Sequence, residues 1–197
     1  MERIQRVREM RLSSPDLGTQ KKADTPWLFR ETNNPEHYIV VPSASSERRR
    51  YIPLGFMDSN TIPTNATLII PDASLYHFGI LTSNVHMAWM RVVCGRLKSD
   101  YRYSKDIVYN NFPWPTPTEA QKQKIEQTAQ AILDARARHP ECSLAVLYDE
   151  AIMPTDLRKA HQDNDRAVMF AYGFTPGKTQ ESECVEQLFK MYQELTK

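Results

Sequence analysis

The chain has 197 residues, of which 41% are hydrophobic and 25% are charged. This length suits one ordinary domain, or one domain with a small companion, because domains usually contain about 100–150 residues. The 25 Lys and Arg residues against 24 Asp and Glu give a formal net charge of +1, which excludes a strongly polybasic binder and an acidic disordered tail. The 13 prolines against 6 glycines favour rigid, extended connections.

The apolar and cysteine patterns exclude further classes of protein. No run of about 18 apolar residues is present, so we expect no transmembrane helix and no membrane partner. The opening segment, MERIQRVREMRLSS, lacks the apolar core of a secretory signal. Cys94, Cys142 and Cys184 are an odd number without a CxxC pair, which favours a reducing cytoplasm over a disulfide framework or a zinc site.

The first part of the chain mixes helix and strand signals. An arginine-rich helix is predicted over residues 3–11. Residues 37–43 and 51–57 are rich in β-branched and aromatic residues, and the polar segment 44–50 between them suggests a hairpin. Residues 67–71 predict a third strand.

A longer helix follows over residues 82–95, with Gly95 as its expected stop. Residues 98–103 and 106–109 predict further strands. The helix would bury one face, because its apolar residues follow the spacing i, i+3, i+4, i+7 and i+8, at Val85, Ala88, Trp89, Val92 and Val93.

Composition changes at the proline-rich run 112–117 (FPWPTP), which fits neither helix interior nor central strand and predicts a strap. Four helices are predicted beyond it, over residues 118–138, 143–149, 154–172 and 180–195. We therefore predict an α+β fold, with a mixed-sheet domain and flanking helices over residues 1–117 and a small helical bundle over residues 118–197. The first has 15 Lys and Arg against 11 Asp and Glu, and the second 10 against 13, which weakly indicates an anionic partner for the first.

No catalytic pattern is visible. The sequence has no GxGxxG turn for a nucleotide or for S-adenosylmethionine. Residues 173–179 are one residue short of a P-loop and follow a helix, and Asn111 stands where the NPP-aromatic motif of amino-methyltransferases has proline. The five histidines lack metal-ligand spacing. We expect no catalytic residue, metal or cofactor in this chain, and a stand-alone enzyme is disfavoured.

Two segments carry residues suited to a nucleic acid. The first supplies three hydroxyls and three guanidiniums within eight positions, and such groups donate to phosphate oxygens. The alternative is a solvated hairpin tip. Its six residues are Ser43, Ser45, Ser46, Arg48, Arg49 and Arg50.

The second segment contains Lys98 and Asp100, which would share one face if the backbone were extended. A donor beside an acceptor matches a G·C pair, which offers guanine acceptors and a cytosine amino group in the major groove. The alternative is a surface ion pair worth less than about 1 kcal/mol. Phosphate or packing contacts would flank the pair, from Arg96, Arg102, Tyr103 and Lys105.

Several motifs together resemble one protein family. They are residues 26–31 (PWLFRE), 41–56 (VPSASSERRRYIPLGF), 75–91 (LYHFGILTSNVHMAWMR), 95–104 (GRLKSDYRYS) and 109–115 (YNNFPWP). This set resembles the target-recognition domain of the MmeI-type (type IIL) restriction–modification enzymes. Residues 143–148 (SLAVLY), 153–161 (MPTDLRKAH) and 171–174 (AYGF) resemble the helical C-terminal region of the same family. One departure is Asn164, where an apolar residue would be expected.

The resemblance implies a sequence-specific module for double-stranded DNA within a larger bacterial polypeptide. An upstream adenine-N6 methyltransferase domain would use S-adenosylmethionine, and a nuclease, if present, would use Mg²⁺. The resemblance also implies that Lys98 and Asp100 set one base of the recognition sequence and select guanine there. The alternative from the residues alone is a protein–protein interaction module that docks through the acidic helical part, without a role in nucleic-acid binding.

Overall fold

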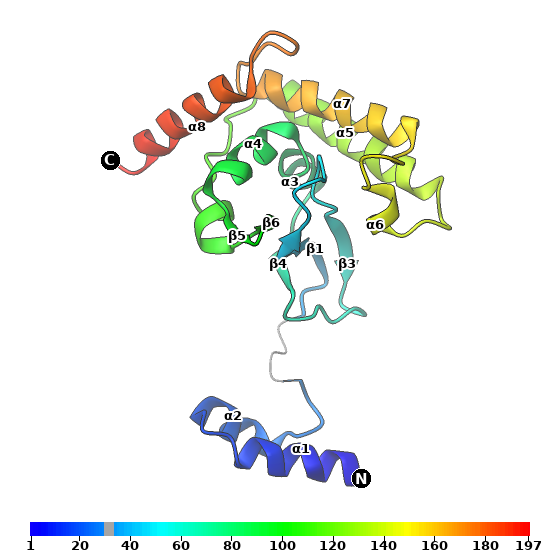
Figure 1. Ribbon diagram of the computed structural model, residues 1–197, viewed down its shortest axis with the longest axis vertical. Coiled ribbons are helices and arrows are strands. Elements are labelled where there is room, and N and C mark those ends of the chain that lie inside the picture. Colours follow the sequence, from blue (N-terminus) through cyan, green and yellow to red (C-terminus); the bar gives the residue numbers. More distant parts are fainter. Residues whose placement is uncertain (30–33) are drawn as a thin grey trace. The chain divides into compact units, whose positions relative to one another are not determined.

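The computed structural model describes residues 1–29 and 34–197, in two units, Met1–Pro35 and Glu36–Lys197 (Figure 1). The smaller unit contains α1 (Glu2–Leu12), α2 (Leu17–Lys21) and the 3-10 turn η1 (Lys22–Asp24), so the helix predicted over residues 3–11 is confirmed. Of the PWLFRE motif, Arg30 and Glu31 lie outside the described residues.

Arg11 holds the smaller unit together. Its side chain is buried, and its guanidinium donates to the carbonyl oxygens of Lys22, Thr25 and Leu28 at 2.7, 2.9 and 2.6 Å. One arginine thus satisfies three backbone acceptors at and beyond η1, which a small unit with few apolar contacts needs in order to fix its chain path.

The first sheet of the larger unit has β1 (His37–Pro42) at its centre, between β3 (Gly55–Asp58) and β4 (Thr67–Pro71). Both pairings are antiparallel, which confirms the predicted pairing of the first two strands and the strand over residues 67–71. The second strand begins at Gly55 rather than at residue 51. Residues 51–54 instead cross the core, where Tyr51, Ile52 and Leu54 are buried.

The second sheet has the order β2-β6-β5, from β2 (Ala44–Ser45), β6 (Asp100–Arg102) and β5 (Gly95–Leu97). The continuous strand predicted over residues 98–103 is wrong, because the chain reverses at residues 98 and 99. The strand predicted over residues 106–109 is also wrong. That segment is the π-helical turn η2 (Lys105–Tyr109), which starts where the Ser104 hydroxyl accepts from the Ile107 amide.

The helices are those predicted, with two additions, α2 in the smaller unit and one helix in the larger unit. Their starts carry side-chain caps at Ser83, Thr118 and Ser143. The helix α3 was not predicted, and the helix after it ends at Val93 rather than at Gly95. The bounds are α3 (Leu75–Leu81), α4 (Asn84–Val93), α5 (Glu119–Ala137), α6 (Leu144–Leu147), α7 (Thr155–Ala171) and α8 (Glu181–Leu195).

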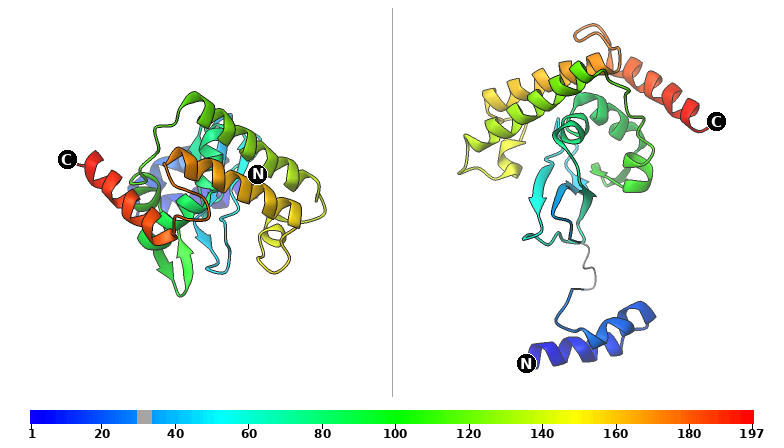
Figure 2. Two further views of the ribbon diagram at one scale, coloured as in Figure 1. Left: turned by 90° about the horizontal axis from the view of Figure 1, so that it is seen from above. Right: turned by 180° about the vertical axis from the view of Figure 1, so that it is seen from behind.

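The helices form layers over the first sheet. Figures 1 and 2 show α5 and α7 side by side, with α3 and α4 beneath them and β3-β1-β4 beyond. One core runs through these layers and includes Ile39, Phe78, Trp89, Ile125 and Val168. The α+β prediction with a C-terminal helical region is confirmed. The predicted domain boundary at residue 117 stays a prediction. Residues on both sides of it contribute to this core.

The FPWPTP strap has no regular secondary structure and is packed into the core. Phe112 is buried, and Trp114 lies 5.6 Å from its ring. The Pro113 carbonyl accepts from the Tyr172 hydroxyl at 2.9 Å. The strap therefore fixes the start of α5 through aromatic contacts and a hydrogen bond to the region just after α7.

Asn164 is accommodated by its neighbours. It is fully buried on α7, its Nδ2 donates to the Gly79 carbonyl at 2.8 Å, and its Oδ1 accepts from the Thr128 hydroxyl at 3.0 Å. A polar residue at this apolar position is thus satisfied by groups on α3 and α5.

Among the described residues, no helix is both long and apolar enough to cross a membrane. In the same part of the chain, no three His, Cys, Asp or Glu side chains gather as a metal ion would require.

The Gly79→Ala variant is expected to lose about 1–2 kcal/mol of unfolding free energy. A Cβ at Gly79 would lie 2.6 Å from Ile125 Cγ2 and 3.2 Å from Ala129 Cβ. Overpacking of about 1–3 kcal/mol then outweighs a helix-propensity gain of up to about 1 kcal/mol. Urea unfolding measures the difference. Gly55→Ala is the control, since its Cβ would meet only Leu144, at 3.9 Å. Equal unfolding midpoints for the two variants would contradict the close packing of α3 on α5.

Candidate nucleic-acid interface

The strand pairing of β2 with β6 joins the two segments that the sequence singled out. Ala44 pairs with Arg102 and Ser45 with Tyr101, and the Tyr103 amide donates to the Ser43 carbonyl at 2.9 Å. The left view of Figure 2 shows that the β5–β6 hairpin and the chain after β2 protrude on the same side of the unit. Residues some fifty positions apart thus form one surface.

The tip of the hairpin is a tight turn. Leu97 pairs with Asp100, so Lys98 and Ser99 are the two turn residues, and Lys98 has a φ of +57°. That conformation costs a residue other than glycine about 1–2 kcal/mol, and such strain is often found at functional positions. Lys98 and Asp100 are both exposed at the tip, although not as neighbours on one extended strand.

Arg96 braces this turn from within. Its guanidinium lies 4.2 Å from the Tyr101 ring centroid and donates to the carbonyls of Ser99 and Arg91 at 3.0 and 3.3 Å. Its donors are therefore largely used inside the hairpin, although the side chain is exposed. On β6, Asp100 and Arg102 point to the solvent face, opposite the buried Tyr101.

Asp100 also connects the hairpin to residues 46–50. Its Oδ1 accepts from the Glu47 amide at 3.3 Å. Within residues 46–50, the Ser46 hydroxyl accepts from the Arg48 amide and the Ser46 carbonyl from the Arg49 amide, at 3.3 and 3.1 Å. These bonds form a short turn that holds Arg48 and Arg49 at the surface.

A hollow of about 730 Å³ lies beside this turn. Arg48 and Arg49 line one part of it, and Asp149 and Glu150, which follow α6, line another. The Glu150 carboxylate is already paired with Arg158 at 2.6 Å. The surface around residues 46–50 is therefore bordered by carboxylates of the C-terminal helical region.

Three of the predicted contact residues are not available to a ligand. Tyr103 is 5% exposed and its hydroxyl is bonded to His86 Nε2 at 3.0 Å. The Ser45 hydroxyl is buried without a partner in the described part of the chain, and the Ser43 hydroxyl donates to the Ala66 carbonyl at 2.7 Å. Ser45 and Tyr103 are therefore buried beneath the sheet, and the Ser43 hydroxyl is used in a bond to the backbone. The alternation of a two-residue strand could not reveal this.

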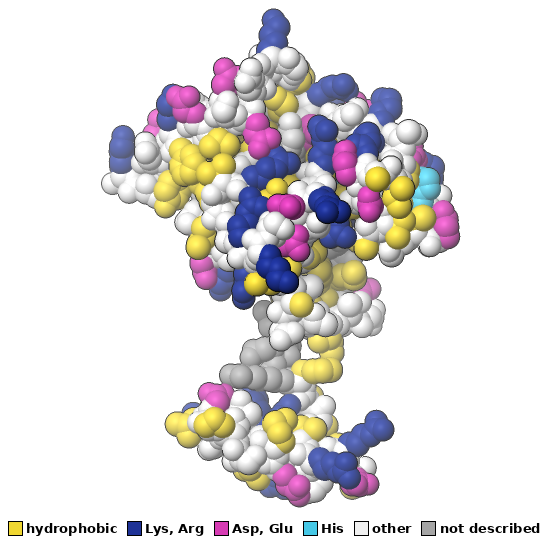
Figure 3. Space-filling view, in the orientation of Figure 1, with side chains coloured by type: hydrophobic (Ala, Val, Ile, Leu, Met, Phe, Trp, Pro, Cys, Tyr) yellow, Lys and Arg dark blue, Asp and Glu magenta, His cyan; other side chains and the backbone are white. Residues whose placement is uncertain are grey.

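The remaining charged residues form what we call the basic edge. Its members lie on residues 46–50, the β5–β6 hairpin and the start of η2, and Figure 3 shows Lys and Arg gathered on this face with a few acidic side chains among them. They are Glu47, Arg48, Arg49, Arg50, Arg96, Lys98, Asp100, Arg102 and Lys105.

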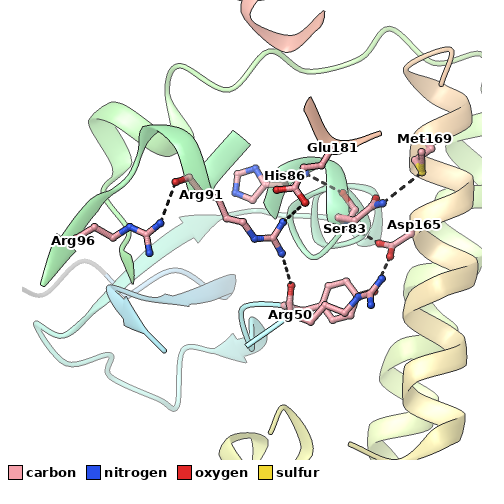
Figure 4. A network of polar contacts seen from close by, with 10 residues as sticks. Arg50, Ser83, His86, Arg91, Arg96, Asp165, Met169 and Glu181 are labelled. Carbon is pink, nitrogen blue, oxygen red and sulfur yellow. Dashed lines mark hydrogen bonds and ion pairs between the residues drawn. The ribbon is translucent and has the colours of Figure 1, made fainter. Parts of the chain in front are cut away.

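A buried polar layer lies behind the basic edge (Figure 4). Asp165 on α7 accepts from the Tyr51 hydroxyl at 2.7 Å and from the Asn84 amide at 2.8 Å. Burial raises the pKa of Asp165 to about 6, although both hydrogen bonds act to lower it. The sequence offered one signal for this residue, a carboxylate within a helix whose buried face also carries Leu157 and Val168.

Two buried histidines belong to the same region. Burial lowers the pKa of His86 to about 3. Burial, followed by the nearby Arg136, also lowers the pKa of His161 well below its ordinary value. His161 stacks on Tyr51 with ring centroids 4.1 Å apart, and its Nε2 lies 2.7 Å from the Tyr148 hydroxyl. Both imidazoles are therefore neutral structural groups at neutral pH.

Comparison with protein families gives two matches. Residues 1–116 match the model described as "MmeI, target recognition domain", and residues 117–197 match "MmeI, C-terminal domain".

Individual relatives are similar over nearly the whole chain. DNA methyltransferase A of Bacillus subtilis (strain 168) is 45% identical over 196 residues, which are 99% of this chain and 22% of that protein. A solved structure described as "Structure of Type IIL restriction-modification enzyme MmeI in complex with DNA has implications for engineering of new specificities" superimposes with a TM-score of 0.91 at 47% identity. That match covers 99% of this chain and 26% of the other, so this chain spans about a quarter of the length of such relatives.

Stability is expected to fall as the pH decreases from 6 to 4.5. The two buried histidines stay neutral in the fold but take up protons when unfolded below about pH 6.5, and each contributes a slope of about 1.4 kcal/mol per pH unit. Asp165 opposes them, because its raised pKa makes the folded state take up a proton first. These three groups together then contribute a slope of about 1.4 kcal/mol per pH unit.

The Asp165→Asn variant should double that slope, since it removes the opposing group. Urea titrations at pH 4.5, 5.25 and 6 measure both proteins. Equal slopes would show that Asp165 does not titrate in this window.

Proposed function

The chain belongs to the MmeI family of restriction–modification enzymes, as its motifs predicted, and we propose that it recognises a specific sequence in double-stranded DNA. The observation that carries this proposal is the pairing of β2 with β6, which assembles the basic edge from two distant segments. Exposed Arg and Lys donors there suit phosphate oxygens, and a hairpin that stands out from the unit suits a groove.

We propose separate roles for the members of the basic edge. Arg48, Arg49, Arg102 and Lys105 would contact phosphates, because their charged groups make no hydrogen bond or ion pair within residues 1–29 and 34–197. Ser46 and Arg50 border these contacts. Arg96 would mainly support the turn. Lys98 and Asp100, at the tip, would read one base pair, with guanine as the base that their donor and acceptor groups suit.

The wider activity follows from the relatives. DNA methyltransferase A is named as a DNA methyltransferase, and we propose that this chain positions an upstream adenine-N6 methyltransferase domain of the same polypeptide. S-adenosylmethionine would be the cofactor of that domain, and Mg²⁺ would be the metal of a nuclease if the polypeptide also cleaves DNA. The target adenine would be rotated out of the helix into the methyltransferase. We place the protein in the cytoplasm, where its unpaired cysteines remain reduced.

The Arg102→Ala variant is expected to weaken binding to every duplex alike and to reduce the salt dependence of binding. One lost phosphate contact lowers the slope of log K against log salt by about 0.9. Fluorescence anisotropy with a random-sequence duplex at several salt concentrations measures this. Arg166→Ala is the matched control, since Arg166 is exposed on α7 and paired with Asp163 at 2.7 Å. If wild-type protein binds no duplex at low salt, the protein–protein alternative gains instead.

Exchanging the two tip residues, Lys98→Asp with Asp100→Lys, is expected to change the preferred base pair at one position and leave the other positions unchanged. The reason is that the donor and acceptor trade places. Selection from a random duplex pool, followed by sequencing, gives the preference of each protein. Lys105→Ala, which should weaken binding without changing preference, is the control. An unchanged preference with weaker binding would contradict base reading by this pair.

A further inference from the structure

One carboxylate of the C-terminal helices contacts the residue that follows residues 46–50 and the first residue of the helix that leads into the β5–β6 hairpin. Asp165 is 6% exposed. Its Oδ2 accepts from Tyr51, which directly follows Arg50, and its Oδ1 accepts from the amide of Asn84, the first residue of α4. The other end of α4 leads through Cys94 into β5. Figure 4 shows Asp165 on α7 directed toward the start of α4 at Ser83 and toward the loop that carries Arg50.

The far end of α4 is held as well. Arg91 donates to Glu181 on α8 at 2.9 Å and to the Arg50 carbonyl at 3.5 Å, while its own carbonyl accepts from Arg96. Residues 46–50 and the hairpin are thus connected to each other through α4. Both are connected to the C-terminal helices through Asp165 and Glu181.

The chain just after residues 46–50 is fixed from a second side. Tyr51 stacks on His161 of α7, and Arg136 of α5 donates to the Leu54 carbonyl at 2.6 Å and to the Tyr148 hydroxyl. A buried carboxylate is costly unless donors satisfy it, and loss of one partner is more costly than loss of an exposed bond. Tyr51 and Asp165 are both buried, so they can influence a ligand only through the position of the basic edge.

We infer that Asp165 is a positioning residue, through which the C-terminal helices hold residues 46–50 and the β5–β6 hairpin in the relation that DNA reading needs. The first half of this inference, that Asp165 holds the two segments in place, concerns the chain without DNA. The consequence for DNA rests on the proposed function.

Hydrogen–deuterium exchange of the chain tests whether Asp165 holds residues 46–50 and the β5–β6 hairpin in place. Informative amides are those of Glu47, Arg49 and Tyr103, which are bonded to Asp100, Ser46 and Ser43. Tyr51→Phe removes one hydroxyl and should speed their exchange about tenfold, as expected for a lost hydrogen bond to a charged group. Tyr172→Phe is the matched control, because it removes a hydroxyl bonded to the Pro113 carbonyl, away from both segments.

Two substitutions of Asp165 complete the exchange test. Asp165→Ala should speed exchange in both segments. Asp165→Asn should largely restore protection at pH 7.5, because its amide can accept from Asn84 while donating to the Tyr51 hydroxyl. If the Asp165→Ala variant fails to fold, exchange in the Tyr51→Phe and Asp165→Asn variants still tests the positioning role of Asp165. Exchange in the segments that is no faster for Tyr51→Phe than for Tyr172→Phe would overturn the inference.

Duplex selection tests the consequence for DNA. Tyr51→Phe should reduce discrimination between the duplex preferred by the wild-type chain and its single-base-pair variants about tenfold, with the salt slope kept, whereas Tyr172→Phe should match wild type. Unchanged discrimination together with faster exchange would overturn the link to reading. If the wild-type chain binds no duplex, the proposed function fails, and the exchange result alone still decides whether Asp165 positions the two segments.

Discussion

The pairing of β2 with β6 is the contact on which the basic edge depends, and it consists of only two residue pairs. A sheet this short is not stable by itself in water. Its stability comes from the core that it covers. Tyr101 and Tyr103 are buried there, and the Tyr103 hydroxyl is hydrogen-bonded to His86 on α4. The residues that face inward therefore determine where the exposed ones stand.

The C-terminal helices supply much of that support. The helices α5 and α7 cover α3 so closely that a Cβ at Gly79 would lie 2.6 Å from Ile125 Cγ2 and 3.1 Å from Asn164 Oδ1. Asn164 closes the same junction with hydrogen bonds to α3 and α5. The C-terminal helices can thus determine the geometry of the basic edge, which lies outside them. Residues 36–117 and the C-terminal helices would then act as one mechanical unit.

The sequence predicted most helices because their apolar spacing and capping residues are local signals. It missed α3 because residues 75–81 are apolar on several faces and show no clear period. It predicted a strand over residues 106–109 because a short apolar run does not distinguish strand from helical turn. The reversal at Lys98 carries neither Gly nor Asn, the residues that normally mark a positive φ.

The candidate site was predictable in part for similar reasons. Chemical type identified both segments, since clustered guanidiniums and a donor–acceptor pair can be seen in the sequence. Their approach could not be predicted, because β2 and β6 are distant in the chain and their two-residue pairing leaves no periodic pattern. The inward orientation of Ser45 and Tyr103 was hidden for the same reason. Asp165 and Asn164 were recognisable only as polar residues out of place, and their partners required the fold.

The charges on the basic edge indicate whether the chain would bind any DNA duplex or select a sequence. Arg96 is occupied by the Tyr101 ring and two carbonyls, so part of the positive charge stabilises the hairpin rather than a ligand. Two carboxylates, Glu47 and Asp100, stand among the free cations, and a surface that only gripped phosphates would be weakened by them. A carboxylate is useful at such a surface when it accepts from a base amino group, on cytosine N4 or adenine N6. The near-neutral charge of the chain is therefore better matched to selecting a sequence than to holding any duplex.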